Sequence, residues 1–421
     1  MPTPSLLIVP ARFKSGKLYS QLPTSGGDFT VTRALGTATR VNASGYIESV
    51  ASGIPRLDYF ASGGTVGCPA LLVEPSAQNL AVQSEDFTLS ASWNTSVAGR
   101  TLATGNVTAT LDPYGGNVAD LLSDDNTASS THRMYTAGNI SITSGTTYST
   151  SFFVKANTTP WFEIRLMQSN ETDAGIVGTV FNLTSGTITS GSGTIQNYGN
   201  GWYRCTNIGT SNFTGNGRIF FYVYNSSGTK SYNGTSSNSL YIFGAQLETG
   251  SVATSYIPTL AAAVTRNADV VSVSGAVSGS IGQASGTIYA EVDIRNAFAG
   301  TFISLDIGST ADFLIIGRTS SFAVIVQIKK SSGSTVTIIT SSAVALGVHK
   351  IALGYTNGDY ALYIDGVSAG TSTNSTDYPS AALTRCNLAV TAYNVFNDRI
   401  RAAALYTTRL TNAELAALTT P

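Results

Sequence analysis

Residues 346–370, LGVHKIALGYTNGDYALYIDGVSAG, contain the signature of a β-hairpin. Within this stretch the residues of 359–364, DYALYI, follow the two-residue period that places alternate side chains on opposite faces of a strand. Asp365 and Gly366 come next, and this dipeptide supplies the positive φ angles of a tight hairpin turn. We therefore predict two antiparallel strands joined at this dipeptide.

The segments on either side of this hairpin extend the β pattern and end it with a helix. SGTIYAEVDIRN at 285–296 and NDRIRAAALY at 397–406 have the composition of strands, and TNAELAAL follows at 411–418. Thr411 and Glu414 have the spacing of a capping box, in which each side chain binds the other residue's backbone N–H. The spacing predicts a short helix at 411–418, with β-structure before it.

These three segments, in this order, resemble the laminin G-like, concanavalin A-like lectin sandwich. The resemblance covers most of residues 273–421. It implies a sandwich of two antiparallel sheets with a lectin-like surface.

Residues 79–258 have the size and the strand content of a second sandwich. Short β-rich runs recur there between Gly, Asn and Ser turns; examples are TYSTSFFVKA (147–156), WFEIRLM (161–167), GRIFFYVYN (217–225) and SLYIFGAQLE (239–248). The segments NLAVQSEDF (79–87), GNGWYRCT (199–206) and FGAQLETGSVATSYIPT (243–259) resemble jelly-roll modules of phage virion proteins and of carbohydrate-binding modules. The predicted fold class is all-β, with two tandem antiparallel sandwiches, first a jelly roll and then a concanavalin A-like sandwich, behind an N-terminal arm.

The remaining segments are assigned to connections. Residues 1–27 are predicted to form an arm that docks on a partner, because the apolar patch Leu6–Val9 has no obvious partner within so short a segment. Residues 28–78 show three strand signals, too few for an independent domain, and are expected to pack on the domain that follows. Residues 259–272 are predicted to be a linker.

One short motif occurs twice. FTVTRA at 29–34 is similar to AAVTRNA at 262–268, and each precedes a β-rich unit. Either the two copies have the same joining role, or the similarity arose by chance in a chain rich in Thr and Ala.

The composition excludes several functional classes. The 421 residues include 23 Lys and Arg against 24 Asp and Glu, and only 11% are charged, whereas about 25% is usual. Ser (51) and Thr (55) make up a quarter of the chain. We therefore expect an uncharged, hydroxyl-rich surface and no nucleic-acid partner. No apolar run approaches the roughly 18 residues of a membrane span, so no membrane insertion is expected.

The candidates for catalysis are few. Glu291 and Asp293 lie two apart on a predicted strand and resemble part of the E-x-D-x-E motif of laminarinase-type glycanases. Arg295 and Asn296 occupy the two positions where the third carboxylate of that motif would stand. We therefore predict no enzymatic activity, with the carboxylates on a solvated strand face; a glycan-degrading appendage is the alternative.

The histidines and acidic clusters are expected to be structural. With only two histidines, His132 and His349, and three separated cysteines, multi-His metal sites and disulfide frameworks are not expected. Asp124, Asp125 and Asn126 form the densest group of possible calcium ligands, and a polar turn explains them as well. No cofactor and no metal is predicted.

Sugar binding would use exposed aromatic rings, and the chain contains only three tryptophans. Trp202 lies beside Tyr203 in a turn and is expected to anchor a sandwich core, whereas Trp93 and Trp161 are not assigned. The sequence therefore assigns no ligand-binding residue.

Residues 27–59 and 68–87 resemble a lead-in segment of phage fibre and appendage proteins. The resemblance implies a structural protein of a bacteriophage, a head or tail fibre or a decoration protein, on the virion surface after assembly in the bacterial cytoplasm. The implied partners are other phage structural proteins, through residues 1–27, and a neutral or weakly charged host polysaccharide. A homo-oligomer is expected, with a trimer favoured by analogy with fibres. A purely architectural decoration protein is a further alternative.

Overall fold

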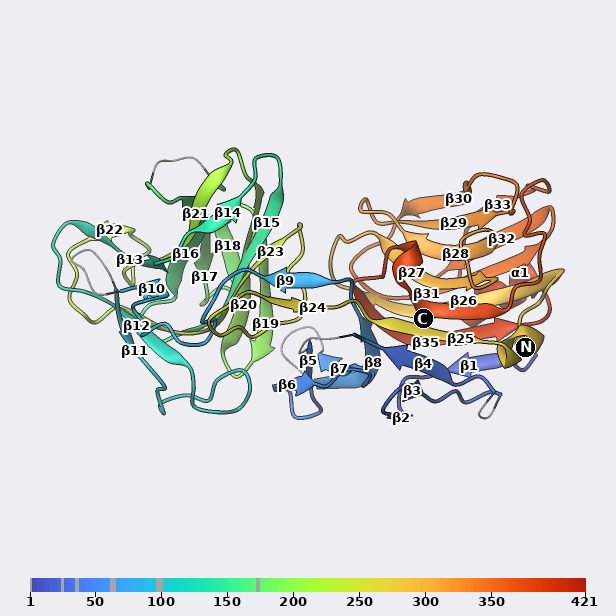
Figure 1. Cartoon of the computed structure of the whole chain (residues 1–421), viewed down its shortest axis with the longest axis horizontal. Helices are drawn as coiled ribbons and strands as arrows, with labels where there is room; N and C mark the ends of the chain where they lie inside the picture. The colour runs from blue at the N-terminus through green and yellow to red at the C-terminus, as the bar shows by residue number, and fades with distance from the viewer. Residues whose placement is uncertain (1, 24–25, 35–37, 61–65, 96–100, 172–174) are drawn as a thin grey trace.

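The chain folds into two β-sandwiches placed side by side (Figure 1). The computed structural model describes residues 2–23, 26–34, 38–60, 66–95, 101–171 and 175–421. Within these ranges every sheet is antiparallel, and α1 (Asn412–Thr419) is the one α-helix beside two short 3-10 turns, η1 (Ala276–Ser280) and η2 (Thr391–Tyr393). The predicted all-β class of antiparallel sandwiches is confirmed.

We call the sandwich that contains both chain ends the terminal sandwich. Its sheet A has the order β33 (Val367–Ser372), β32 (Asp359–Ile364), β31 (Gly347–Thr356), β26 (Ser285–Ile294), β35 (Asp398–Tyr406), β8 (Val66–Val73) and β7 (Leu57–Phe60), and β1 (Leu6–Ile8) also pairs with β35. Its sheet B has the order β2 (Phe13–Lys14), β3 (Lys17–Leu18), β4 (Phe29–Thr32), β25 (Val270–Ser274), β34 (Arg385–Ala389), β27 (Gly300–Asp306), β28 (Phe313–Arg318), β29 (Ala323–Lys329) and β30 (Val336–Ala343).

The core of the terminal sandwich follows the two-residue period of its strands. In β26 the side chains of Ile288, Ala290, Val292 and Ile294 are fully buried in one apolar cluster between the sheets. The predicted hairpin is present: β32 and β33 flank a turn in which Asp365 and Gly366 both have positive φ. The helix α1 lies over the outer face of sheet A, where Leu415 joins a smaller apolar cluster.

We call residues 79–258 the inserted sandwich. Its sheet C has the order β10 (Trp93–Asn94), β13 (Ser130–Thr136), β21 (Gly215–Val223), β16 (Trp161–Gln168), β17 (Thr179–Asn182) and β18 (Thr187–Ser190), joined by β14 (Ile140–Ile142) and β22 (Ser231–Tyr232). Its sheet D has the order β11 (Thr101–Thr104), β12 (Asp120–Asp124), β23 (Ser239–Thr249), β15 (Thr147–Ala156), β20 (Trp202–Thr210) and β19 (Gly193–Gly199).

The two sandwiches are nested in the chain, which corrects the simple tandem order expected from the sequence. The chain enters the inserted sandwich through β9 (Ala77–Asn79) and leaves it through β24 (Val264–Arg266). These two strands pair with each other, so the predicted linker 259–272 contains half of a two-stranded connection (Figure 1). Its last residues already belong to β25 of the terminal sandwich.

The N-terminal segment is not a free arm. Leu6 and Ile8 are buried in the core of the terminal sandwich, and β1 pairs with β35, about 400 residues further along the chain. The patch was expected to dock on a partner because no partner is obvious within so short a segment; the structure instead gives it a partner in β35 of the same chain. The physical reason is that β35 has a free edge beyond β8, and an unpaired edge strand is stabilised by another strand. Residues 24–25 of the segment lie outside the described residues.

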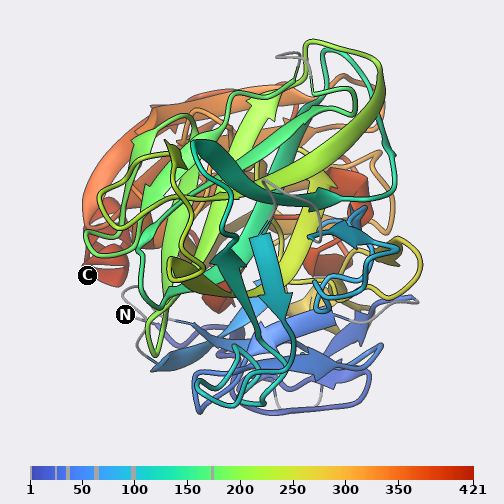
Figure 2. The same cartoon turned by 90° about the vertical axis from the view of Figure 1, so that its left-hand side faces the viewer.

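Residues 28–78 pack mainly on the terminal sandwich, whereas packing on the domain that follows was expected. Strands β4, β7 and β8 complete the two sheets of the terminal sandwich. The hairpin β5 (Ala38–Val41)–β6 (Ile47–Val50) also reaches the inserted sandwich, where Ile47 joins an apolar cluster on the outer face of sheet D, and Phe60 of β7 packs on Tyr198. In the end-on view these N-terminal strands, in blue, lie at the lower edge of the molecule, and Figure 1 places them along the terminal sandwich and at the junction (Figures 1 and 2). Residues 35–37 and 61–65 lie outside the description.

A buried network of charges ties these segments together, and the two copies of the VTR motif meet in it. Arg33 pairs with Asp269 at 2.9 Å, and Arg266 pairs with Glu74 at 3.2 Å. Arg56 lies between them and binds both carboxylates. Burial opposes ionisation of Glu74, but the guanidinium groups of Arg266 and Arg56 lower the pKa of Glu74 below its usual range. Both copies of the motif therefore contribute an arginine to the same joint.

The predicted capping box is present, and its removal gives a first test of the fold. The Thr411 hydroxyl accepts a hydrogen bond from the Glu414 backbone N–H, and the Glu414 side chain accepts one from the Thr411 N–H. We expect Thr411→Ala to destabilise the terminal sandwich by about 1 kcal/mol, the usual cost of losing an N-cap. Thr408→Ala, at an exposed position before the helix, is the control. Equal urea midpoints for both variants would contradict this assignment.

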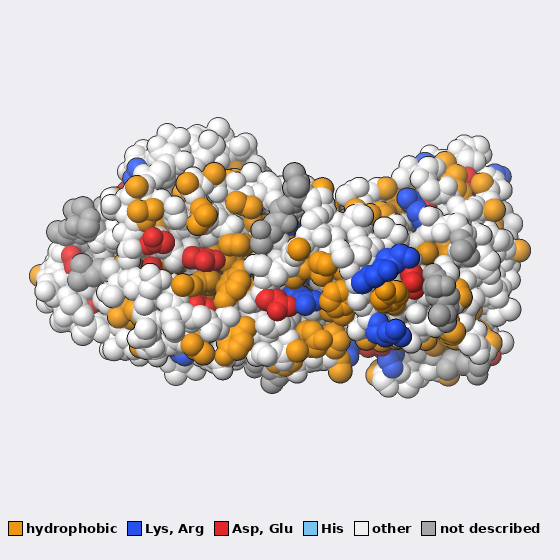
Figure 3. Space-filling view, turned by 60° about the horizontal axis from the view of Figure 1, so that its bottom comes forward, with side chains coloured by type: hydrophobic (Ala, Val, Ile, Leu, Met, Phe, Trp, Pro, Cys, Tyr) orange, Lys and Arg blue, Asp and Glu red, His pale blue; other side chains and the backbone are white. Residues whose placement is uncertain are grey.

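The surface has few charges, as the composition predicts. On the face seen in Figure 3, neither charged nor hydrophobic side chains cover most of the molecule, and Lys and Arg gather mainly over the terminal sandwich. Among the described residues, no helix is long and apolar enough to cross a membrane.

Candidate functional site

The two carboxylates singled out on β26 are engaged by arginines. Glu291 lies 2.9 Å from Arg401, and Asp293 accepts two hydrogen bonds from Arg295 at 2.6 and 2.9 Å. Asn296 binds the backbone carbonyl of Asn397. Asp293 is buried, so this strand face is less solvated than expected. The arrangement is a row of ion pairs on the outer face of sheet A.

Both histidines have structural hydrogen bonds. The Nδ1 atom of His349 lies 2.6 Å from Asp365, and its Nε2 atom lies 2.9 Å from the carbonyl of Ala345, so the ring ties the hairpin turn to the loop before β31. The Nδ1 atom of His132 lies 2.7 Å from Asp125, and its ring packs on Tyr232. Neither ring adjoins a pair of groups that could form a catalytic triad in the described part of the chain.

The acidic cluster at 124–126 organises the neighbouring loop. Asp124 accepts hydrogen bonds from the backbone N–H groups of Thr235 and Asn238. The side chain of Asn126 accepts one from Ser236. Within the described residues no group of three or more His, Cys, Asp and Glu side chains converges as metal ligands would.

Two of the three tryptophans are buried. Trp93 is enclosed in the core of the inserted sandwich. Trp202 is also buried, but it lies in the cluster on the outer face of sheet D and not between the sheets, which corrects the expected position; its indole N–H binds the carbonyl of Leu111. Tyr203, its neighbour, is half-buried against the core.

Trp161 is half-buried beside an aromatic cluster on the outer face of sheet C. The cluster includes Phe220 and Tyr222, and cations cover its rings: the Lys230 ammonium lies 3.9 Å from the Tyr222 ring centre. The Arg133 guanidinium lies 5.9 Å from the Phe220 ring centre. Because these rings stack on cations, they leave little free face for a sugar.

An open groove lies instead on the outer face of sheet B, and we call it the outer groove. Its volume is about 370 Å³, within the range usual for small-ligand sites. Its lining comes from β27, β28, β29 and η2 and from the loops beside them; the residues are Thr301, Thr310, Phe313, Ile315, Gln327, Lys329, Thr335, Ala392, Tyr393 and Asn394.

Strand alternation explains the floor of the outer groove. Leu314 and Ile316 point into the sandwich core. The alternate residues Phe313 and Ile315 therefore face outward. Tyr393 packs edge-on against Phe313, with ring centres 5.3 Å apart and planes at 71°. The floor is therefore apolar and partly aromatic, whereas the rim carries hydroxyl, amide and ammonium groups.

Buried polar groups hold Tyr393 in place. Its hydroxyl donates to the carbonyl of Ser309 at 3.2 Å. Burial raises the pKa of Tyr393, and the nearby Asp306 carboxylate raises it further, so the phenol keeps its proton at neutral pH. Asp306 is itself occupied, because Arg385 binds it through two hydrogen bonds of 2.7 and 2.8 Å. The position of Tyr393 on the floor is thus fixed by contacts within the protein.

The lining defines what chemistry the outer groove can perform. Among the described residues around it, Lys329 is the one charged side chain and no carboxylate is present. Cleavage of a glycosidic bond ordinarily uses two carboxyl groups on opposite sides of the bond. The groove offers apolar contact and hydrogen bonds, which are the means of reversible binding.

Sequence reasoning missed every residue of this groove. Phe313 and Ile315 could have been found as outward positions of a strand in the run DFLIIGR at 312–318. Gln327 and Lys329 have the same two-residue spacing in β29. Nothing in the sequence, however, places Tyr393 beside them, because that contact joins two segments that are distant in the chain.

Comparison with known proteins gives likenesses of limited extent. A carbohydrate-binding module, CBM40, of the Ruminococcus gnavus IT-sialidase, solved with α2,3-sialyllactose, is similar over 32% of this chain and 83% of its own, with a TM-score of 0.29 and 17% identity. A SAP-like pentraxin of Limulus polyphemus covers 32% of this chain and 68% of its own, with a TM-score of 0.26 and 12% identity.

A third likeness is to domain 4 of an extracellular arabinanase of Geobacillus stearothermophilus, solved with arabinotriose. It covers 36% of this chain and 73% of its own, with a TM-score of 0.31 and 16% identity. No protein-family model and no curated protein sequence matches the chain. The function is therefore argued from the site itself.

Proposed function

We propose that the protein is a non-enzymatic, lectin-like attachment protein that holds a neutral or weakly charged glycan in the outer groove. The observation that carries this proposal is the composition of the groove: an apolar floor of Phe313, Ile315 and Tyr393 beneath a rim of hydroxyl and amide groups. A sugar ring has an apolar C–H face and a hydroxyl edge, and this lining complements both.

The rim supplies hydrogen bonds to the glycan, and several copies of the site together make attachment strong. Gln327 and Lys329 lie on one strand at the edge of the floor and can donate hydrogen bonds to sugar hydroxyl oxygens. A shallow groove buries little area, so a single site binds weakly, and several copies acting together raise the overall affinity. The proposal therefore includes a homo-oligomer, with a trimer favoured. Light scattering tests it: a mass near that of one 43.7 kDa chain would contradict self-association in solution.

The absence of cleavage is part of the proposal and has its own test. The ion pair of Glu291 with Arg401 is partly exposed, so Glu291→Gln should change stability by less than about 1 kcal/mol. We expect host polysaccharide incubated with either protein to gain no reducing ends. New reducing ends that form with the native protein and disappear with Glu291→Gln would establish the glycan-degrading alternative.

We propose further that the protein is displayed on a bacteriophage particle, as a head or tail fibre or a decoration protein. This rests on the resemblance of residues 27–59 and 68–87 to phage lead-in segments. Docking is assigned to the segment 1–27, and within it to the hairpin β2–β3, where Phe13 and Lys14 are exposed, because Leu6 and Ile8 are used inside the sandwich.

Substitution in the hairpin tests docking better than deletion of the whole segment, which would remove β1 from sheet A. We expect Phe13→Ser combined with Lys14→Ser to leave the fold intact and to reduce incorporation into particles. The control replaces Thr187 and Thr189, two exposed residues of β18, with Ser. Equal incorporation of both variants would contradict docking through this hairpin.

A further inference from the structure

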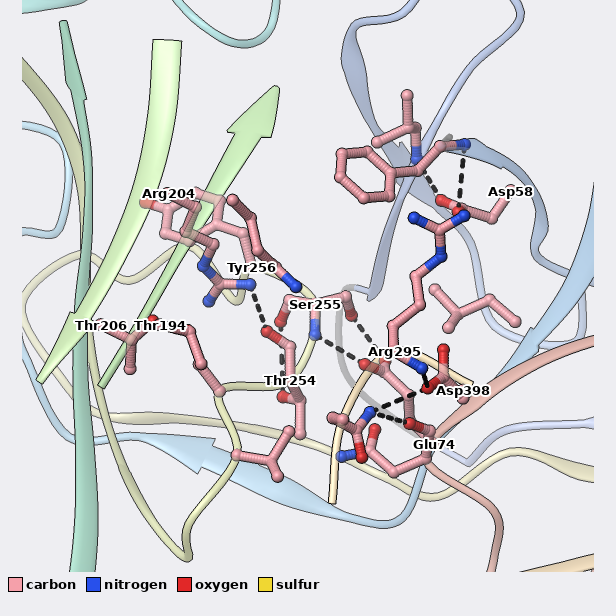
Figure 4. Close-up of a pocket in the computed structure, with 18 of the residues that line it drawn as sticks. Asp58, Glu74, Thr194, Arg204, Thr206, Thr254, Ser255, Tyr256, Arg295 and Asp398 are labelled. Carbon is pink, nitrogen blue, oxygen red and sulfur yellow. Dashed lines mark hydrogen bonds between the residues drawn. The ribbon is translucent and has the colours of Figure 1, made fainter. Parts of the chain in front are cut away.

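A second hollow lies at the junction of the two sandwiches, and we call it the junction hollow. It encloses about 230 Å³ and is lined by the outer face of sheet D, the 251–256 loop, the segment 295–297 and the segment 397–399. Figure 4 shows Thr194, Thr206 and Arg204 on the side of the inserted sandwich, facing Arg295 and Asp398 on the side of the terminal sandwich. It shares no residue with the outer groove.

The arginines of this hollow differ in their partners. Arg295 pairs with Asp293, Arg399 pairs with Asp58, and Arg40 pairs with Glu48. Arg204 is 3% exposed, and no carboxylate oxygen lies within 4.0 Å of it in the described part of the chain. Its hydrogen bonds go to the carbonyl of Thr254 at 2.6 Å and the hydroxyl of Ser151 at 3.1 Å.

Glu248 interacts electrostatically with Arg204, but the two side chains form no ion pair within 4.0 Å. Glu248 is buried, and its carboxylate accepts hydrogen bonds of 2.8 and 2.6 Å from the backbone and hydroxyl of Thr254. Burial raises the pKa of Glu248, which weakens its ability to balance a cation. A buried guanidinium without a close anion is unfavourable, and an anionic ligand would compensate it.

In the described part of the chain, three buried donors of the lining have no hydrogen-bond partner. They are the Nε atom of Arg204, the Nη1 atom of Arg40 and the side-chain amide nitrogen of Asn397, which is 4% exposed. The carboxylates of the hollow are already engaged: Asp58 binds Arg399, Glu74 binds Arg56 and Ser255, and Asp398 binds Arg399 and Asn296. The groups that lack a partner are thus hydrogen-bond donors, and acceptor oxygens of a ligand would satisfy them.

The rest of the lining suits a sugar ring. Tyr198 lines the hollow between the two sandwiches and packs on Phe60, with ring centres 4.6 Å apart. The guanidinium groups of Arg295 and Arg399 lie over the Phe60 ring, 5.1 and 5.3 Å from its centre, so Tyr198 is the aromatic ring of this pair that a sugar can contact. Thr194 and Ser251 are exposed at its mouth, and Gln196 is half-buried beside them, so hydroxyl and amide groups surround the opening.

We propose that the junction hollow binds one acidic sugar residue, with its carboxylate toward Arg204 and Asn397 and its ring beside Tyr198. A guanidinium binds a carboxylate through charge-assisted hydrogen bonds, which makes Arg204 the main determinant of affinity. The site is independent of the outer groove, because it selects a charged unit and lies between the domains. A ligand there would also contact both sandwiches and hold them together.

Titration calorimetry on the full chain tests this site with three probes: glucuronate, glucose and acetate. Glucuronate should bind at least about tenfold more tightly than glucose, which lacks the carboxylate, and than acetate, which lacks the ring; tenfold corresponds to 1.4 kcal/mol. Binding of acetate as tight as that of glucuronate would show a simple carboxylate site and overturn the sugar assignment.

Variants locate the binding. Arg204→Gln removes the buried charge, and Thr194→Trp blocks the mouth from an exposed strand position, so the second variant remains informative if the first fails to fold. Both should weaken glucuronate binding at least about tenfold, whereas Thr187→Trp on β18 and the outer-groove variant Gln327→Ala/Lys329→Ala should leave it unchanged. Undiminished binding to Thr194→Trp, or no binding of glucuronate by the native chain, would overturn the proposal.

Discussion

Asp269→Asn is expected to destabilise the terminal sandwich by about 3–5 kcal/mol, the usual cost of removing one partner from a buried ion pair. Asp269 binds Arg33 at 2.9 Å and also binds Arg56, and it accepts the backbone N–H of Glu74 at 3.0 Å. Without its charge, three buried arginines would share the single carboxylate of Glu74. Urea unfolding followed by circular dichroism and by the fluorescence of the tyrosines, several of which, such as Tyr355 and Tyr360, lie in the terminal sandwich, measures the effect.

The control for this prediction is an ion pair at the surface of the same region. Arg40 and Glu48 lie 2.7 Å apart, but the Glu48 side chain is 36% exposed, so Glu48→Gln should cost less than about 1 kcal/mol. If both substitutions shift the unfolding midpoint by the same small amount, the buried network does not stabilise the joint.

The second large effect is expected at the outer groove. Gln327→Ala combined with Lys329→Ala removes the two rim donors contributed by β29 but leaves the floor of Phe313, Ile315 and Tyr393 in place. Each site should lose about tenfold in affinity, and in an oligomer that binds through several copies the loss of retention on a polysaccharide should be larger still. Retention on immobilised host polysaccharide measures it.

Thr340→Ala provides the matched control, because Thr340 is exposed on β30 of the same sheet and does not line the groove. It should bind like the native protein. If the rim variant and this control are retained equally, the glycan does not bind in the outer groove, and the lectin-like proposal loses the observation that carries it.

The features that could be predicted from the sequence are those with local signals. The capping box of Thr411 and Glu414 fixed the start of α1, and the Asp365–Gly366 pair fixed a hairpin turn. Both depend on residues that are neighbours in the chain, so their geometry follows from spacing alone. The core side of β26 was predictable for the same reason, since Ile288, Ala290, Val292 and Ile294 follow the two-residue period of a strand.

The features that could not be predicted depend on contacts between distant segments. The pairing of β1 with β35 joins the two ends of the chain, and short apolar runs such as LLIV give no indication of which strand edge they will cover. The insertion of one sandwich within the chain of the other could not be predicted from the sequence for the same reason. The repeated VTR motif was a correct hint of a shared role, but only the structure places Arg33 and Arg266 in one network.

The candidate site shows the same limit. Sequence reasoning pointed to Glu291 because carboxylates two apart have a known catalytic precedent, and the structure pairs it with Arg401. The outer groove has no such precedent in its residue types, because Thr, Gln, Phe and Tyr are common throughout the chain. Its character comes from the outward-facing residues of sheet B and from η2, which brings Tyr393 to Phe313.

The most direct test of binding without cleavage is one incubation of the purified protein with polysaccharide from its host, in which bound polysaccharide and new reducing ends are both measured. We predict that the native protein retains the polysaccharide, that Gln327→Ala/Lys329→Ala does not, and that neither produces reducing ends. Reducing ends generated by the native protein, or equal retention by the two proteins, would contradict the account.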